Sequence, residues 1–492
     1  MLKKIDSFLN TTTTYRLVLY HLTLLVAVAL LESLFGIIPY GAFDLLFSVV
    51  LLVAVCFAVN TACAKLVGAV TNVESVYITA FILALIMNPV APTDGRGILV
   101  LVLAATLAMG SKYVLALDKK HFLNPAAFGV ALLPLLGVGS ASWWVGGNLP
   151  LLPFVLVGGV LVVRKMRRAD LVGTFVIVAL VTIVLTSAAG DVFATLHATL
   201  LYGAFLFLAT VMLTEPATMP PTHALRMVYG AIVAILYAPA VHLGPVYLLP
   251  EQALLVGNLF ALLVSSRGRY TMRLVEKHLP VASIDEFVFV PDRPVAFKPG
   301  QYLEWTLPHS PSDARGNRRY FTIASSPTEK RIRLGIKFYE PASSFKRALG
   351  SLKINDTISA AGVAGDFTLP RNTAKKLAFI AGGIGVTPFR SHVQYVVDRE
   401  EQRDIVLLYA SKPDEIVYRD LFDRAAQAIG MRTVYIPGMI DTALIKKEIP
   451  DYKERTFYLS GPPGMVDAHK KALRRMGVWR FNIKTDYFPG FV

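Results

Sequence analysis

Apolar runs fill the first 265 residues of this chain, whereas charged residues concentrate in the remainder. Residues 1–266 hold only 13 of the 49 lysines and arginines, so 36 of them follow residue 266. Hydrophobic residues make up 54% of the chain and the mean hydropathy is +0.53, which is too apolar for an ordinary soluble protein. We therefore expect a polytopic α-helical membrane domain over residues 1–266. We read its ten spans as residues 15–38, 42–65, 75–91, 97–117, 124–138, 150–163, 170–188, 192–213, 224–243 and 246–265.

The positive charges between these runs indicate how the chain is oriented. If the N-terminus is cytoplasmic, all the lysines and arginines of the intervening loops face inside except Arg96, as the positive-inside rule requires. An even number of spans returns the chain to the cytoplasm near Arg267. We expect a multi-pass protein of the cell inner (cytoplasmic) membrane, with its N-terminus and its charged part on the cytoplasmic side. The polar start, Met1–Arg16, predicts no cleavable signal peptide.

Charge and cysteine content exclude several other classes. The net charge of +15 fits cytoplasmic loops, an anionic leaflet and phosphorylated cofactors, so we expect a lipid membrane as partner and no nucleic acid. The two cysteines, Cys56 and Cys63, lie seven residues apart in one apolar run. Cysteine-ligated iron–sulfur clusters need more thiolates than this, so we expect no metal site.

Three of the apolar runs are interrupted by proline, asparagine and acidic residues, at 86–95, 122–137 and 214–223. Broken helices free backbone groups, which in a bilayer must line a cavity or a ligand. Ordinary loop ends are the alternative interpretation. The sequences Phe122–Ala126 and Thr214–Thr218 resemble the membrane D subunit of Rnf complexes and the B subunit of sodium-pumping NADH:quinone reductases, over most of residues 45–265.

That resemblance implies about ten spans, a bound flavin and electron transfer across or within the membrane. Many members of the family hold FMN covalently through the threonine of a Ser-Gly-Ala-Thr-like loop. This chain has no such tetrapeptide. The resemblance therefore leaves a second, non-covalent flavin (FMN or riboflavin) or a quinone in the membrane domain, and other redox subunits as partners.

The charged part has two kinds of pattern. Short alternating strands separated by turn residues fill residues 268–370, which predicts an antiparallel β-barrel domain at 267–372. Strands then alternate with helices, which predicts a parallel, doubly wound α/β domain at 373–492.

The predicted barrel carries residues suited to a flat, anionic ligand. Arg319 offers a planar donor fork for a pyrophosphate, and Phe321, two residues along the strand, points to the same face and can pack on a ring system. Thr322 can hydrogen-bond a ring heteroatom. Ser343 or Ser344 is expected to cap a helix whose first N–H groups bind phosphate. The remaining candidates are Tyr320 in the same strand and the small-residue turn Gly362, Gly365, Asp366 and Phe367.

The α/β domain begins with a strand and a glycine-rich turn. Gly382, Gly383 and Gly385 lead into Thr387, expected as N-cap, and Pro388, expected at the first helical position. Such a turn presents a helix N-terminus to a phosphate. A second turn, Ser460-Gly461-Pro462, follows a later strand, where ligands bind in such sheets.

These residues resemble the ferredoxin–NADP reductase superfamily across residues 268–492. The resemblance implies FAD on the barrel, NADH or NADPH on the α/β domain, and hydride transfer between them. It implies that Arg319, Phe321 and Thr322 form the flavin motif, and that Thr322 and Ser460 lie at the reacting centre. Ser460 stands where many members have cysteine. One C-terminal aromatic residue, Phe491, is expected to cover the flavin ring.

For the second nucleotide, Lys412 or Arg419 suits a 2′-phosphate, whereas Asp414 or Glu415 suits a bare ribose. Analogy with the membrane-family relatives favours NADH.

We thus predict an FAD-dependent NAD(P)H oxidoreductase in the membrane. Its electrons pass from cytoplasmic NAD(P)H through FAD to a membrane-domain flavin, a quinone or an extracytoplasmic acceptor. The first alternative is a haem-containing ferric reductase or NADPH-oxidase-like protein, although His21, His197 and His242 are scattered singly among the runs. The second alternative is a flavin transporter or sensor with a regulatory reductase module.

Overall fold

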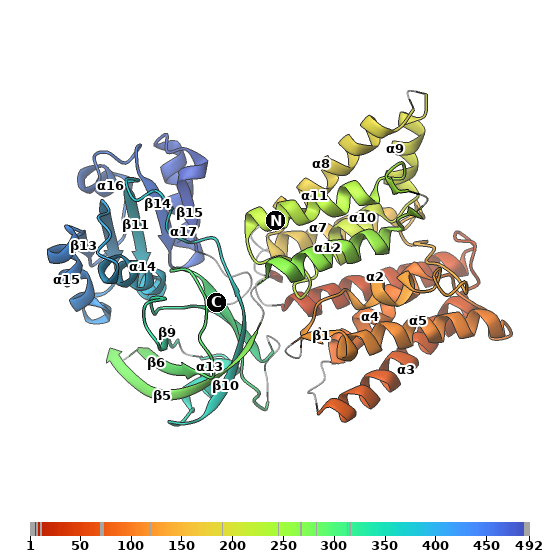
Figure 1. The fold of residues 1–492 in the computed structure, drawn as a ribbon, viewed down its shortest axis with the longest axis horizontal. Helices are drawn as coiled ribbons and strands as arrows, with labels where there is room; N and C mark the ends of the chain where they lie inside the picture. Colours follow the sequence, from red (N-terminus) through yellow and green to blue (C-terminus); the bar gives the residue numbers. More distant parts are fainter. Residues whose placement is uncertain are drawn as a thin grey trace. The chain divides into compact units, whose positions relative to one another are not determined.

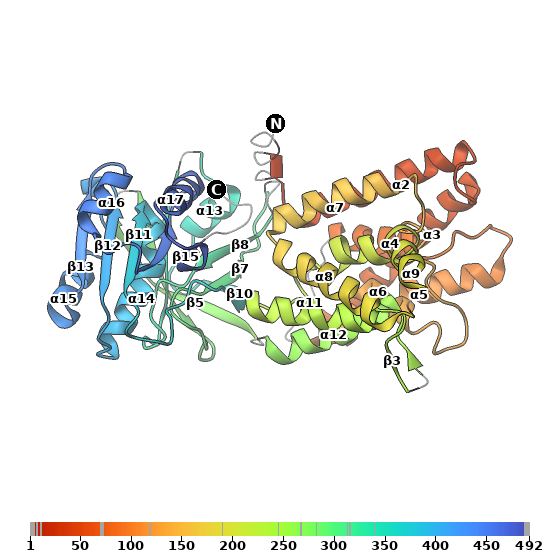
Figure 2. The same ribbon diagram turned by 90° about the horizontal axis from the view of Figure 1, so that it is seen from above.

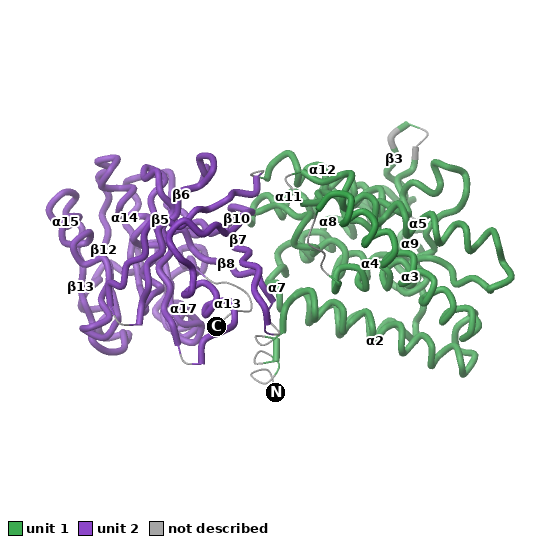
Figure 3. Tube along the Cα trace, turned by 90° about the horizontal axis from the view of Figure 1, so that it is seen from below, with its two compact units in different colours: residues 1–267, 492 green, residues 268–491 purple. Residues whose placement is uncertain are grey.

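The computed structural model divides the chain into two compact units, residues 1–267 and 268–491 (Figure 3). Each unit has its own hydrophobic core, and each is described here by itself. The structure describes residues 5, 8–9, 12–68, 73–117, 120–188, 190–244, 246–265, 268–281, 283–311, 313, 316–339 and 341–486.

The first unit is built almost entirely of helices (Figure 1). Small residues allow close helix packing, as at Gly159, where an added Cβ would lie 2.4 Å from the Thr210 hydroxyl oxygen. The helices are α2 (Thr14–Leu34), α3 (Ala42–Val67), α4 (Val73–Ile86), α5 (Gly95–Val114), α6 (Pro125–Ala131), α7 (Leu152–Met166), α8 (Ala169–Thr186), α9 (Val192–Leu201), α10 (Phe205–Phe207), the π-helix η1 (Leu208–Met212), α11 (His223–Tyr237) and α12 (Pro250–Val264). Two short hairpins pair β1 (Ala116–Leu117) with β2 (Lys120–His121) and β3 (His242–Leu243) with β4 (Val246–Tyr247).

The prediction of ten spans is met in part. Each of the ten apolar runs contains a helix, but among the described residues only α2, α3, α5 and α8 are long and apolar enough to cross a membrane. A fifth span results if α9 and the α10–η1 segment, which meet at 58°, count as one bent helix. The others are shorter than the roughly 20 residues that a 30 Å hydrocarbon core requires. Helix α6, for example, is only seven residues long.

In the second unit, six strands form one antiparallel sheet in the order β8-β7-β10-β5-β6-β9. The alternation of exposed and buried residues along β5 reflects the period of two that points successive side chains to opposite faces. The core on one face includes Phe287, Phe289 and Trp305, and α13 (Ser344–Gly350) adds Phe345 and Leu349. The strands are β5 (Arg269–Val281), β6 (Ile284–Pro291), β7 (Tyr302–Thr306), β8 (Arg318–Thr322), β9 (Ile332–Lys337) and β10 (Thr357–Ala364).

The rest of this unit is a parallel sheet in the order β13-β12-β11-β14-β15, with helices on both faces. The central strand β11 is buried along its whole length, as its apolar sequence predicts. Helices α14 and α15 cover one face, and α16 and α17 cover the other (Figure 2). The elements are β11 (Leu377–Gly382), α14 (Thr387–Asp398), β12 (Ile405–Ala410), α15 (Arg419–Ile429), β13 (Arg432–Ile436), α16 (Thr442–Glu448), β14 (Thr456–Ser460), α17 (Pro463–Arg475) and β15 (Ile483–Thr485), with short 3-10 turns at Gly383–Val386, Pro413–Glu415 and Arg480–Asn482.

Candidate active site

Strand β8 presents the predicted flavin-binding residues on its two faces. Arg319 and Phe321 both contact Phe345 of α13: the guanidinium carbon lies 5.2 Å, and the Phe321 ring 5.9 Å, from the centre of the Phe345 ring. Tyr320 packs edge-on against Tyr302, with 5.6 Å between ring centres. The expected pairing of Arg319 and Phe321 on one face therefore occurs in the structure, and Tyr320 lies on the other face.

A set of donors for an anion lies between β8 and the start of α13. Ser343 is the N-cap of α13 and accepts a hydrogen bond from the Lys346 N–H (3.3 Å). The next residue, Ser344, donates its N–H to the Asp313 carboxylate (3.1 Å), and the Arg319 guanidinium lies 3.5 Å from the other oxygen of that carboxylate. A carboxylate thus already binds to the donors that suit a phosphate, so this donor set fits the FAD pyrophosphate.

Thr322, Ser460 and Asp486 come together from three separate segments. The carboxylate of Asp486 accepts hydrogen bonds from the Thr322 hydroxyl (3.1 Å) and the Ser460 hydroxyl (3.3 Å). Part of Asp486 is exposed, but protein atoms enclose its carboxyl group, and this burial raises its pKa to about 7 against the weaker opposing effect of the two hydrogen bonds. The two predicted catalytic residues therefore share one titratable partner.

Sequence reasoning missed Asp486. It directly precedes the C-terminal aromatic cluster, and only the aromatic residues of that segment stood out in the sequence. Phe491, the candidate to cover the flavin, lies outside the described residues. The signal that could have identified Asp486 is its position directly after a parallel strand, near the edge of the sheet where ligands bind.

The two glycine-rich turns contact each other at that switch point, between β11 and β14. A Cβ atom on Gly385 would lie 2.5 Å from the Cα atom of Gly461, and the Cα of Gly382 lies 3.0 Å from the Cβ position of Gly461. Pro462 and Met465 pack over Gly382 at the start of α17. These three glycines are therefore required by close backbone packing, whereas Gly383, with φ +51° and open space around it, suits a backbone that faces a ligand.

The expected cap of α14 is wrong in detail. A 3-10 turn, Gly383–Val386, runs directly into α14, so Val386 is the N-cap and Thr387 is already helical. The Thr387 hydroxyl donates to the Ile384 carbonyl (3.2 Å) and does not cap an N–H group. Pro388 is still in the first turn, where its missing N–H costs nothing.

The turn after β10 divides into exposed and buried residues. Gly362 has φ +65° at a bulge in β10, and Gly365 has φ +117° beside the Tyr302 ring. Asp366 is exposed. Phe367, expected beside the cofactor, is instead buried in the core, where its ring contacts Phe389, His392 and Tyr458.

Of the four candidates for the second nucleotide, two already have partners. Glu415 forms an ion pair with Lys337 and accepts a hydrogen bond from Ser283 (3.3 Å), so it is held against the antiparallel sheet. The Arg419 guanidinium lies 4.4 Å above the Tyr435 ring centre. Lys412 and Asp414 are exposed.

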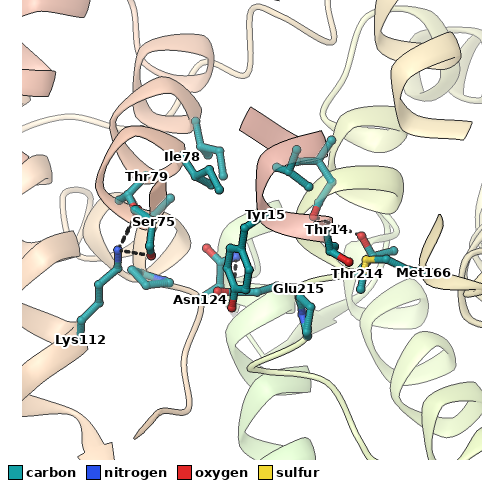
Figure 4. A pocket seen from close by; sticks show the side chains of 16 residues that line it. Thr14, Tyr15, Ser75, Ile78, Thr79, Lys112, Asn124, Met166, Thr214 and Glu215 are labelled. Atoms are coloured by element: carbon teal, nitrogen blue, oxygen red, sulfur yellow. Dashed lines mark hydrogen bonds between the residues drawn. The ribbon is translucent and has the colours of Figure 1, made fainter. Parts of the chain in front are cut away.

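Two of the interrupted motifs in the first unit line one pocket (Figure 4). Asn124, Pro125 and Ala126 come from one motif, and Thr214, Glu215 and Pro216 from the other. On the opposite side, the Lys112 ammonium donates to Ser75 and Thr79, at 2.9–3.1 Å.

The carboxylate of Glu215 connects the broken helices. It accepts hydrogen bonds from the Asn124 amide (2.9 Å) and the Thr218 hydroxyl (3.2 Å), and it lies 3.1 Å from a ring nitrogen of His121. The Asn124 backbone N–H in turn donates to the Asn258 side chain of α12 (2.8 Å). Asn258 thus satisfies one backbone N–H group at the start of α6, and Glu215 bonds to side chains of both interrupted motifs.

Comparisons with known proteins bear on the second half of the chain. Residues 379–471 match the family described as oxidoreductase NAD-binding domain. The glycine betaine monooxygenase reductase subunit of Chromohalobacter salexigens is 24% identical over 231 residues, covering 43% of this chain and 62% of the relative. The flavohemoprotein of Oceanobacillus iheyensis is 25% identical over 242 residues, covering 45% and 59% respectively.

Among solved structures, the flavohem-like FAD/NAD-binding domain of nitric oxide dioxygenase from Vibrio cholerae is similar, with a TM-score of 0.41 and 21% identity over 45% of this chain and 99% of that chain. This chain spans about three fifths of the curated relatives' length. The predicted FAD- and NAD(P)H-dependent oxidoreductase module is confirmed by the family match and the curated relatives.

Proposed function

We propose that the whole protein is a membrane-bound, flavin-dependent NAD(P)H oxidoreductase that delivers electrons to an acceptor held by its first unit. The observation that supports this most is the meeting of Thr322, Ser460 and Asp486, from the antiparallel sheet, strand β14 and the C-terminal segment. Nicotinamide and flavin rings must meet where the two halves of such a reductase adjoin, and these three polar groups lie at that junction.

Bound FAD supplies the chemistry that accepts a hydride and releases single electrons. The protein supplies position and charge. Arg319 and the first N–H groups of α13 are proposed to bind the pyrophosphate, and Phe321 to pack against the flavin. Thr322 and Ser460 orient the reacting edge through their hydroxyl groups, and Asp486 holds or releases a proton beside them. The open backbone at Gly383 is proposed to face the nicotinamide nucleotide.

For the first unit, we propose a multi-pass domain of the inner membrane, related to the D subunit of Rnf complexes, with the second unit in the cytoplasm. The pocket between Lys112 and Glu215 is the proposed site of the acceptor, either a non-covalent flavin or a quinone. Its lining supports this, because donors and acceptors lie beside apolar residues such as Val18, Ile78 and Val211.

Cofactor extraction from the purified protein tests the proposal. We expect FAD at one per chain, and NAD(P)H should bleach its absorption band. A second flavin at one per chain supports a flavin in the first unit, whereas FAD alone with quinone-dependent oxidation of NAD(P)H supports a quinone. A haem Soret band, or a flavin that NAD(P)H does not reduce, would contradict the proposal.

A further inference from the structure

An aromatic pair is exposed on the second unit, between α17 and β15. The side chains of Trp479 and Phe481 are 66% and 63% exposed, and their ring centres lie 5.3 Å apart. The turn that carries them is anchored: Val478 is buried and donates its N–H to the Leu473 carbonyl (3.0 Å), and β15 follows directly. Two large apolar rings held in the solvent by a rigid turn suggest a contact surface.

Cations surround this pair. Arg480 lies over the Phe481 ring at 4.5 Å, and Arg474 and Arg475 are exposed in the last turn of α17, directly before the aromatic residues. The side chain of Lys453 reaches the same turn, because a Cβ on Gly477 would lie 3.8 Å from its Cε atom. In the part of the chain that the structure describes, Lys453, Arg474 and Arg475 form no ion pair.

The acids of the neighbouring loop do not neutralise these cations. Asp451 pairs with Arg455 and Lys376, and Glu454 pairs with Lys376. We define the Trp479 patch as Lys453, Arg474, Arg475, Trp479, Arg480 and Phe481. It presents four positive charges around two aromatic rings.

We propose that the Trp479 patch docks the second unit on an anionic lipid surface. Tryptophan rings are enriched at the level of lipid headgroups, and each lysine or arginine near an anionic leaflet strengthens attachment about fivefold. Only four residues separate the end of α12, Val264, from the start of β5, Arg269. At about 3.5 Å per residue, this link keeps the second unit near any membrane that holds the first. The inference thus rests on the proposed membrane location, but not on the proposed redox reaction.

Spin labelling of the full chain in lipid nanodiscs tests the docking. A nitroxide is placed at Phe481→Cys in a Cys56→Ala, Cys63→Ser background, and a matched label at Gln427→Cys on α15, which covers the other face of the parallel sheet. In nanodiscs with one third phosphatidylglycerol, we expect the label at 481 to collide more with oxygen than with a water-soluble nickel complex. The label at 427 should show the reverse, and so should the label at 481 in pure phosphatidylcholine.

Charge variants separate specific docking from general attraction. Arg474→Gln with Arg475→Gln should lower the ratio of docked to undocked protein about 25-fold. Arg399→Gln with Arg424→Gln removes the same charge from the C-cap of α14 and from α15, on the other face, and should leave the ratio unchanged. Docking that is equal in both lipids, or equally weakened by both pairs, overturns the proposal. Spin–spin broadening at 481 without lipid dependence assigns the patch to a second copy of the chain.

NAD(P)H bleaching of FAD in the same nanodiscs keeps the two proposals distinct. If NAD(P)H bleaches the FAD but the label at 481 stays in water, only the docking proposal is refuted. A label that enters the lipid without bleaching supports the docking and refutes the proposed redox function.

Discussion

The carboxyl group of Asp486 links two strands that the sequence separates widely. Its partners Thr322 and Ser460 lie 164 and 26 residues away along the chain. Because burial raises its pKa to about 7, the group is mainly protonated below neutral pH and ionised above it. The protonated carboxyl group can donate a proton to a flavin ring bound beside it. The ionised carboxylate can only accept one.

Replacing Asp486 by asparagine should therefore remove a pH-dependent step. In the wild type, we expect the rate of flavin bleaching by NAD(P)H to change with an apparent pKa near 7. In Asp486→Asn, the rate should fall about tenfold or more and lose this inflection. Stopped-flow absorbance between pH 5.5 and 8.5 measures both. The control is Asp467→Asn, an exposed carboxylate of α17, and an unchanged profile in Asp486→Asn would exclude this role.

His392 gives a second prediction at the scale of one residue. Complete burial lowers its pKa from 6.5 to about 3, although its hydrogen bonds to the carbonyls of Phe367 and Pro299 oppose the shift. The His392 ring is therefore protonated near pH 6.5 in the unfolded chain but stays neutral at that pH in the folded chain. The stability that neutral His392 contributes is complete above pH 6.5 and is lost as the pH falls toward 3.

Between pH 7.5 and 5.5, this effect should lower the free energy of unfolding by about 1.4 kcal/mol. Asp486 acts in the opposite direction, because its raised pKa favours the folded state as the pH falls. The measurement is therefore the difference in the free energy of unfolding between the wild type and His392→Gln, obtained from urea unfolding at both pH values. A gap between the two proteins that does not change with pH would contradict the prediction.

At the scale of elements, the segment that follows β8 forms hydrogen bonds with helix α14. Strand β8 ends at Thr322, so Ile323, Ala324 and Ser325 lie beyond it. The carbonyls of Ala324 and Ser325 instead accept hydrogen bonds from Arg390 (3.1 Å) and Ser391 (2.7 Å) of α14. The segment that follows the predicted flavin motif therefore joins the antiparallel sheet to helix α14 of the α/β region.

The contact between the two glycine turns yields a prediction for these elements. In Gly385→Ala, the new methyl group would lie about 2.5 Å from backbone atoms of Gly461, and backbone cannot rotate away as a side chain can. We expect a loss of about 1–3 kcal/mol in the free energy of unfolding and weaker binding of NAD(P)H. Thermal unfolding and nucleotide titration of the FAD-bound protein measure these effects.

Gly464→Ala is the matched control, because the Cβ of residue 464 meets nothing within 4 Å and lies in α17. There, alanine should leave stability unchanged or raise it by up to about 1 kcal/mol. Equal effects of the two substitutions would show that the close contact between the turns is unimportant.

At the scale of the whole molecule, the two units have separate cores and a short link. Separate cores predict separate unfolding transitions. A ligand that binds the second unit alone should stabilise that unit alone. FAD at 100 times its dissociation constant should raise the melting temperature of one transition by roughly 5–10 °C.

Differential scanning calorimetry of the detergent-solubilised protein, with and without added FAD, measures this shift. The second transition should move by less than about 1 °C. A single transition that FAD shifts as a whole would instead show that the units unfold together.

The sequence determined what depends on neighbouring residues. Alternating polarity predicted the strands of the second unit, and the two-residue period of a strand predicted that Arg319 and Phe321 share a face. The apolar runs predicted a helix in each case. For the three interrupted runs the sequence left two interpretations open, a lined cavity or ordinary loop ends, and two of the runs line the pocket.

Only the tertiary structure decided which distant segments meet. Asp486 joined Thr322 and Ser460 through strand pairing that brings β15 beside β14, and no local pattern encodes such pairing. The inward path of Phe367, the partners of Glu415 and the convergence of two broken helices beside Lys112 are likewise products of packing. Helix length in the first unit also depended on packing, because proline and glycine end or bend helices where neighbouring elements satisfy the freed groups.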